Sequence, residues 1–221
     1  MGLLARLGIG GPARVPLQDG YAKWAPVYPA RPHNGLMQVE AETVDALLRG
    51  VCATRALDIG TGTGRNLPVL RRTGARLVVG LDLSMDMLGQ APAGAVRVRA
   101  DAVQLPVSAG RVDLVTSSLM AGDLADLTAW FREVSRVLMP GGHFVFSDFH
   151  PSWARQGWRR TFRGSDGRDY ELPYFDHPVE DTVSALAACG LVARVVREPR
   201  AGKPQPVLTV IHAVRIDGRV G

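Results

Sequence analysis

The sequence has few cysteines and few aromatic residues, and it has no long apolar run. Its 221 residues include only two cysteines, Cys52 and Cys189, which lie far apart and fit no metal-binding or redox spacing. We therefore expect reduced thiols in a cytoplasmic protein and no metal site. No apolar run approaches the roughly 20 residues that cross a bilayer. The arginine- and glycine-rich start also differs from a secretory signal, so we expect no membrane span.

Positive charge is in modest excess, with 26 lysines and arginines against 21 acidic residues and a formal net charge of +5. A basic surface attracts nucleic acids, phosphates or acidic carriers. Here the arginines are scattered along the chain, and one modest cluster contains Arg155, Arg159, Arg160, Arg163 and Arg168. We interpret most of this charge as a solvated face, so nucleic acid is not the partner that we expect.

The length is near that of one domain, and the order of the segments indicates an α/β protein. Short runs rich in Val, Leu and Ile alternate with amphipathic segments of helical length. Strands are predicted at 56–60, 76–83, 95–100, 111–118, 142–149, 191–198 and 206–216. Helices are predicted at about 17–25, 35–50, 63–72, 84–90 and 124–138, and from 178 onward. Residues 1–16 are expected to be loosely ordered, and 161–172 to form a hairpin that turns at Gly164 to Gly167.

The strongest signal is the stretch ALDIGTGTGRN, in which a buried strand is followed by Gly60, Gly62 and Gly64. Glycine is favoured there because the backbone turns sharply and approaches a ligand closely. Asp82 ends the next strand, where a carboxylate can accept hydrogen bonds from both hydroxyls of a ribose. This layout suits either a dinucleotide or a nucleoside joined to an amino acid. The dinucleotide pattern G-x-G-x-x-G fails when it starts at Gly60, because position 65 is arginine.

The segment from Asp58 to Gly64 resembles the first motif of the class I methyltransferases that bind S-adenosyl-L-methionine. Asp82, the pair Asp101-Ala102, the strand VDLVTSS and the turn LMPGG extend this resemblance over roughly residues 17–216. It implies a Rossmann-like, mostly parallel, seven-stranded sheet with helices on both faces. The last strand would lie antiparallel beside the fifth, and a hairpin-like insert would follow strand five. A single domain, 1–221, would comprise a lid segment (1–35), a cofactor-binding core (36–149), a substrate-cover insert (150–177) and a final helix and strands (178–221).

The resemblance also implies a set of cofactor-binding residues. They are Tyr21, Asp58, Gly60, Gly62, Gly64, Asp82, Leu83, Asp101, Ala102 and Ser117. Asp58 and the backbone around Gly60 would hold the methionine end, and Asp82 would bind the ribose. Leu83 would lie beside the adenine, which Asp101 and the amide of Ala102 would recognise. Ser117 would pass under the methionine, although a buried serine can also bond to its own backbone.

The stretch DGYAKWAPVY resembles the N-terminal segment of a small branch of these enzymes, which includes quinone C-methylating and carrier-protein methyl-ester-forming members. An aromatic residue covers the cofactor in that branch, and Tyr21 is the candidate here. The branch usually has Tyr-Asp where this sequence has Tyr28-Pro29. The alternative is that Tyr21 and Trp24, three residues apart, only pin a helix to the core.

Asp148 and His150 close the fifth predicted strand and fall on one face of it by the two-residue period of a strand. Ligands of open α/β sheets bind at the carboxyl ends of the strands. His150 is thus a candidate general base, oriented by Asp148 or acting beside it. The alternatives are that His150 only lines the site, or that both side chains anchor a loop. Aromatic residues of the insert 151–177 could line an acceptor pocket, fill a satellite core or form a dimer contact.

These features predict metal-independent methyl transfer from S-adenosylmethionine to an oxygen of a small molecule or a carrier-bound acyl group. The protein would act as a monomer or homodimer. Two other functions stay open. One is methylation of RNA or protein, and the other is a reaction, such as a cyclisation, in which no methyl group is transferred.

Overall fold

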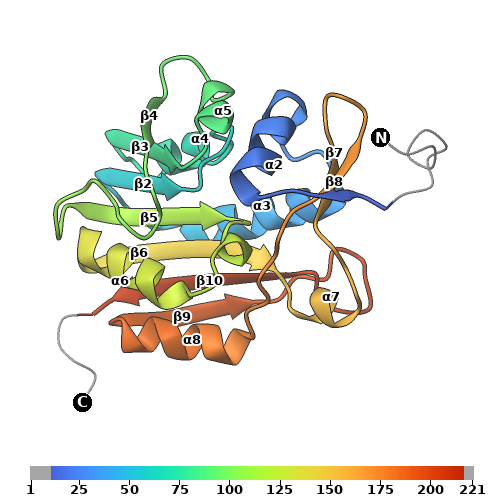
Figure 1. Ribbon diagram of the computed structural model, residues 1–221. Helices are drawn as coiled ribbons and strands as arrows, with labels where there is room; N and C mark the ends of the chain where they lie inside the picture. The colour runs from blue at the N-terminus through green and yellow to red at the C-terminus, as the bar shows by residue number, and fades with distance from the viewer. Residues whose placement is uncertain (1–10, 217–221) are drawn as a thin grey trace.

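The structure is a computed structural model and describes residues 11–216, in which a seven-stranded sheet forms the centre (Figure 1). The strand order is β4 (Val96–Arg99), β3 (Leu77–Asp82), β2 (Arg55–Ile59), β5 (Val112–Ser118), β6 (Leu138–Phe149), β10 (Leu208–Arg215) and β9 (Leu191–Arg197). Strands β4, β3, β2, β5 and β6 pair in parallel, whereas β10 is antiparallel to both β6 and β9. The predicted topology is therefore confirmed.

Helices cover both faces of this sheet, as expected for strands that are apolar on both sides (Figure 1). On one face α6 (Leu127–Val137) packs Trp130 and Phe131 against β6, and α8 (Val179–Ala188) adds Leu186 and lies against β9. On the other face α3 (Gly35–Leu48) and α4 (Leu67–Arg72) contribute a second apolar cluster. The remaining helical elements are α2 (Leu17–Trp24), η1 (Ala25–Val27), α5 (Met85–Gly89), η2 (Ala121–Asp123) and α7 (Ser152–Arg155).

Some boundaries differ from the prediction for local reasons. Helix α4 starts at Leu67, later than expected, because Gly62 and Gly64 adopt positive φ and the chain is still turning there. Strand β6 starts earlier, at Leu138, which pairs with Val112 before the register shifts. Residues 1–10 lie outside the described part of the chain, but Ala13–Arg14, expected to be loose, form strand β1.

A small three-stranded sheet with the order β1-β8-β7 lies beside the carboxyl ends of the central strands (Figure 1). Strands β7 (Thr161–Arg163) and β8 (Asp169–Glu171) form the predicted antiparallel hairpin, and β1 pairs with β8 in parallel. Phe162 and Tyr170 pack with Trp24 of α2 in a separate apolar cluster. This sheet joins the N-terminal segment to the insert after β6, and together they cover the edge where a ligand binds in such folds.

Candidate active site

The glycine loop after β2 is held in place by Asp58, which is buried. Its Oδ2 accepts a hydrogen bond from Thr61 Oγ1 at 2.8 Å, and its Oδ1 accepts from Thr116 Oγ1 at 2.7 Å and from Asn66 Nδ2 at 3.3 Å. Burial raises the pKa of this carboxyl, and the three donors oppose that effect. Asp58 therefore links the glycine loop to Thr116 of β5.

The loop then turns through Gly60 and Gly62, which have φ values of 66° and 54°. A Cβ on Gly60 would lie 2.6 Å from Met120 Cγ, so a side chain has no room there. Asp82 Oδ2 accepts from the Gly62 amide at 2.8 Å, and its Oδ1 accepts from the Ser84 amide at 2.8 Å. Burial raises the pKa of Asp82 as well. These bonds hold its carboxylate at the carboxyl end of β3.

A pocket with about 930 Å³ of empty space, including its open mouth, lies in front of this loop. Its lining includes seven predicted cofactor residues, namely Tyr21, Gly60, Gly62, Asp82, Leu83, Asp101 and Ala102. Asp58, Gly64 and Ser117 do not line it. Ser117 Oγ is buried without a hydrogen-bond partner in the described part of the chain. Asp101 Oδ1 accepts from the Val103 amide at 3.1 Å, so this residue shapes a turn at the pocket rim.

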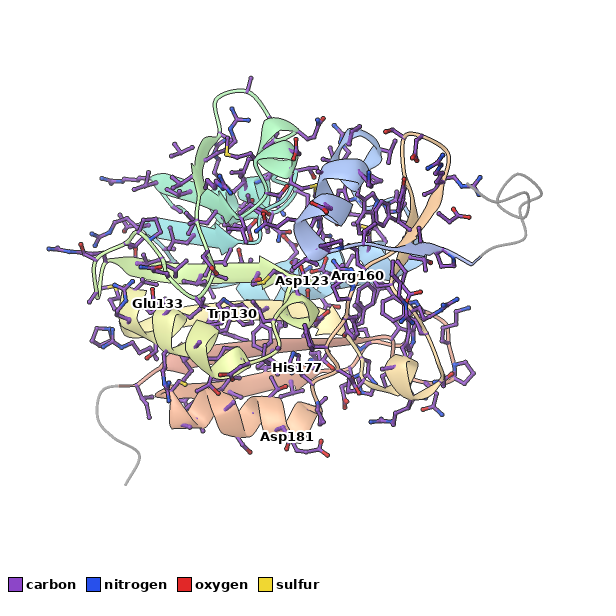
Figure 2. All side chains as sticks on the ribbon, viewed as in Figure 1. Asp123, Trp130, Glu133, Arg160, His177 and Asp181 are labelled. Carbon is purple, nitrogen blue, oxygen red and sulfur yellow. The ribbon has the colours of Figure 1, made fainter. Side chains whose placement is uncertain are left out.

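A second wall of the pocket is a polar cluster of Tyr21, Asp123 and Arg160, which come from α2, η2 and the segment before β7. Tyr21 donates to Asp123 Oδ2 at 2.7 Å, Arg160 Nη2 donates to the Tyr21 hydroxyl at 2.6 Å, and Arg160 Nη1 pairs with Asp123 Oδ1. The Asp123 and Arg160 side chains are both only 7% exposed and lie side by side in Figure 2. Burial raises the pKa of Tyr21 well above 10, which keeps it a neutral donor.

The Arg160 guanidinium also lies over two aromatic rings, 5.5 Å from the centroid of Tyr21 and 5.9 Å from that of Trp24. Its Nε is buried and has no hydrogen-bond partner among residues 11–216. We call Tyr21, Asp123 and Arg160 the cover cluster.

Asp148 lies below this cluster and outside the pocket lining. Its Oδ1 accepts from the Phe149 amide at 2.7 Å and its Oδ2 accepts from the amide of Gly122, the residue before Asp123. Burial raises its pKa from 3.8 to about 7, while Arg160 opposes the rise. The contacts make Asp148 a support for the η2 turn.

His150 does not line the pocket, so the expected pairing with Asp148 at the acceptor end is not seen. Its Nδ1 lies 2.9 Å from Ser152 Oγ, and its Nε2 lies 2.8 Å from Glu198 Oε1. The strand ends at Phe149 and Pro151 leads into α7, so the two-residue period no longer applies to His150. Both ring nitrogens contact residues outside the pocket lining. This geometry fits the alternative in which His150 anchors a loop.

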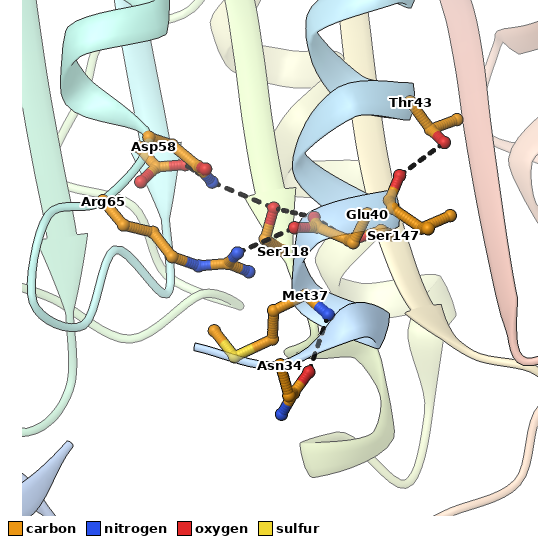
Figure 3. A network of polar contacts seen from close by, with 10 residues as sticks. Asn34, Met37, Glu40, Thr43, Asp58, Arg65, Ser118 and Ser147 are labelled. Atoms are coloured by element: carbon orange, nitrogen blue, oxygen red, sulfur yellow. Dashed lines mark hydrogen bonds and ion pairs between the residues drawn. The ribbon is translucent and has the colours of Figure 1, made fainter. Parts of the chain in front are cut away.

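Sequence reasoning missed several pocket residues, including Asp123, Arg160, Tyr28 and Arg65. It also missed Glu40, which is fully buried in α3 and pairs with Arg65 at 2.8 Å (Figure 3). The sequence does indicate that Glu40 is buried, because Glu40 has the same helical spacing as Met37, Val44 and Leu48 on the buried face of α3. A carboxylate on an apolar helix face needs a buried partner.

The sheet topology, the glycine loop and the acid at the end of β3 together define a protein that binds a nucleoside cofactor at the carboxyl edge of an α/β sheet. The comparisons narrow this class. The family described as methyltransferase domain matches residues 57–146. The malonyl-[acyl-carrier protein] O-methyltransferase of Enterobacter lignolyticus is 34% identical over 208 residues, with coverage of 83% of this chain and 81% of that protein. The chain belongs to the class I S-adenosylmethionine-dependent methyltransferases.

Other relatives agree with this family. The demethylmenaquinone methyltransferase of Mycolicibacterium gilvum is 36% identical over 98 residues, which cover 44% of this chain and 42% of that protein. A crystal structure of an S-adenosylmethionine-dependent methyltransferase from Mesorhizobium loti matches with a TM-score of 0.68 and 27% identity, over 82% of this chain and 100% of that chain. The chain spans 23% to 57% of the length of four further curated relatives. Among the described residues, no helix combines the length and apolar character that crossing a bilayer requires.

The pocket fits S-adenosylmethionine, the cofactor of this family. Asp82, Leu83 and Ala102 line the pocket, where Asp82 would accept from the ribose hydroxyls and Leu83 and Ala102 would lie beside the adenosine. Gly60 and Gly62 also line the pocket, so the methionine end would lie against the backbone of the glycine loop.

Proposed function

We propose that this chain transfers the methyl group of S-adenosylmethionine to a carboxylate oxygen of a small molecule or a carrier-bound acyl group. The observation that carries the proposal is Arg160, a buried guanidinium at the pocket wall whose Nε has no partner among the described residues. An unused buried donor is costly, and an anionic acceptor would satisfy it. The Enterobacter relative is a malonyl-[acyl-carrier protein] O-methyltransferase, and its name agrees with such an acceptor.

The residues of the chain would divide the task between the two pocket walls. The glycine loop and Asp82 would bind and orient the cofactor, which supplies an electrophilic methyl group. Arg160 would orient the acceptor so that one carboxylate oxygen faces this methyl group, while Asp123 and Tyr21 hold the guanidinium in place. Alignment in a site that excludes water can supply much of the rate of such a displacement.

Transfer to a carboxylate needs no general base, because this nucleophile is already ionised at neutral pH. We therefore assign no proton transfer to His150, whose ring nitrogens contact Ser152 and Glu198. Asp148 acts as a positioning residue in this proposal, since it binds the amide of Gly122 and so orients Asp123.

We further propose a single functional domain that acts in the cytoplasm as a monomer or homodimer, on a small or carrier-bound acceptor in preference to nucleic acid. The free thiols of Cys52 and Cys189 support a reducing compartment. The burial of Arg160 supports an acceptor-binding role for this member of the basic cluster, since a cation that served a nucleic-acid surface would be exposed.

The test measures formation of S-adenosylhomocysteine with malonyl-coenzyme A and malonyl carrier protein, each against its methyl ester. We expect product from the free carboxylates and none from the esters. Turnover only with a quinol, RNA or protein acceptor would contradict a carboxylate acceptor. Tight cofactor binding with no S-adenosylhomocysteine from any of these acceptors would favour a reaction without methyl transfer.

A further inference from the structure

Arg65 follows the glycine loop directly and is a second buried cation of the pocket wall. Its side chain is 8% exposed, and its Nη1 donates to Glu40 Oε2 at 2.8 Å. Its Nη2 is buried and has no hydrogen-bond partner among the described residues, although Arg65 lines the pocket. A guanidinium has five N–H donors, so one carboxylate partner leaves donors free for a ligand.

Glu40 is fully buried and does not line the pocket, so it does not contact that ligand. Its Oε1 accepts from Ser118 Oγ and from Ser147 Oγ, both at 2.6 Å, while Oε2 binds Arg65 (Figure 3). These bonds join α3 to β5, to β6 and to the segment after the glycine loop. The guanidinium of Arg65 is therefore held in one orientation by a residue that is itself held from three sides.

We propose that Arg65 binds the carboxylate of the cofactor's methionine through Nη2, and that Glu40 is the positioning residue for this contact. The inference rests on the proposed function only for the identity of the cofactor. Asp82, Leu83 and Asp101 line the pocket at the ends of β3 and β4, where the adenosine would lie. Arg65 lines it on the side of β2 and β5, together with Gly60 and Ser118, where the amino-acid end of the cofactor would then lie.

The charges beside Arg65 favour a ligand whose carboxylate is accompanied by positively charged groups. Arg65 is already neutralised by Glu40, so a lone anion would leave a net negative charge in a buried site. The methionine group carries an ammonium and a sulfonium beside its carboxylate, which balance that charge.

The experiment compares the calorimetric affinities of S-adenosylmethionine and decarboxylated S-adenosylmethionine, which differ in one carboxylate. We expect the unmodified protein to prefer the complete cofactor by about tenfold to a hundredfold, the range of a charged hydrogen bond. In Arg65→Met this preference falls to nearly one. Arg160→Lys is the matched control and keeps the preference, because the contact belongs to Arg65.

Arg65→Met leaves Glu40 as an unpaired buried carboxylate, so the double variant Glu40→Gln/Arg65→Met provides a folded alternative with the same expected loss of preference. Glu40→Gln alone should lower the preference partially and leave the KM for the acceptor unchanged, which a merely structural role for Glu40 would not produce.

Two outcomes would overturn the assignment. One is a preference that persists in both Arg65 variants. The other is a preference that disappears in Arg160→Lys as fully as it does in Arg65→Met. Because binding is measured without turnover, failure of the proposed methyl transfer would leave this ratio unaffected, so the two proposals fail independently.

Discussion

The two walls of the pocket are built in different ways. The loop wall consists of the glycine loop and Asp82, and the Gly62 amide joins this loop to Asp82 at the end of β3 within one βαβ unit. The cover cluster on the other wall joins residues 21, 123 and 160 across the whole chain. A wall built from residues close together in sequence suits a cofactor that is the same throughout a family. A wall built from distant segments can differ between members that act on different acceptors. The comparison predicts that substitutions in the two walls will affect different steps.

The largest effect is expected from Asp82→Ala on the loop wall. The change removes the acceptors for the ribose and for the Gly62 amide, so cofactor affinity should fall by about a hundredfold or more. Isothermal titration calorimetry with S-adenosylhomocysteine checks this value. Asp86→Ala, an exposed acid in α5, is the control and should change affinity by less than about twofold. Equal losses in both variants would contradict the ribose role of Asp82.

The next effect concerns Arg160→Lys on the cover wall. The change keeps the charge but loses the forked donors, so kcat/KM for a malonyl thioester should fall by about tenfold to a hundredfold. The Kd for the cofactor should stay within about threefold. Arg159→Lys, at a neighbouring and half-exposed site, is the matched control. If cofactor affinity fell as far as kcat/KM, the two walls would not be separable.

The difference between the walls also explains how far the sequence predicts the structure. The glycines and Asp82 follow from local spacing, since a strand, a tight turn and a helix leave few alternatives. The sequence alone favours a solvated position for Arg160, because its burial depends on Asp123 and Tyr21, which no local pattern links to it. The His150 prediction extended the period of a strand past its end, where Ser152 and Glu198 determine the ring position. The contact of Tyr21 with the cofactor stays a prediction.

Asp148 accepts from the amide of Gly122, next to Asp123 of the cover cluster, and its ionisation can be tested through protein stability. Its pKa is raised by burial from 3.8 to about 7, so the folded protein binds a proton that the unfolded chain releases. This contribution to stability is fully present below about pH 4 and is lost as the pH rises through about 7, with a slope of at most about 1.4 kcal/mol per pH unit.

The measurement is urea unfolding at several pH values between 4 and 8, for the unmodified protein and for Asp148→Asn. The difference in unfolding free energy isolates Asp148 from the other buried acids, Asp58 and Asp82, whose pKa values are also raised. The unfolding free energy of the variant minus that of the unmodified protein should increase as the pH rises. A difference that is independent of pH would show that Asp148 is ionised throughout, as its two backbone donors, the amides of Gly122 and Phe149, favour.

The smallest effect is expected from Tyr21→Phe, which removes one hydroxyl from the cover cluster and keeps the ring. Asp123 and Arg160 still pair directly, so only the hydrogen bonds through the hydroxyl are lost. We expect kcat/KM for the malonyl thioester to fall by about threefold to tenfold, as for a single hydrogen bond. Cofactor affinity should be unchanged, because a lid acts through the face of the ring. If the affinity fell instead, the hydroxyl would serve the cofactor and Tyr21 would belong to the loop wall in function, despite its position in α2.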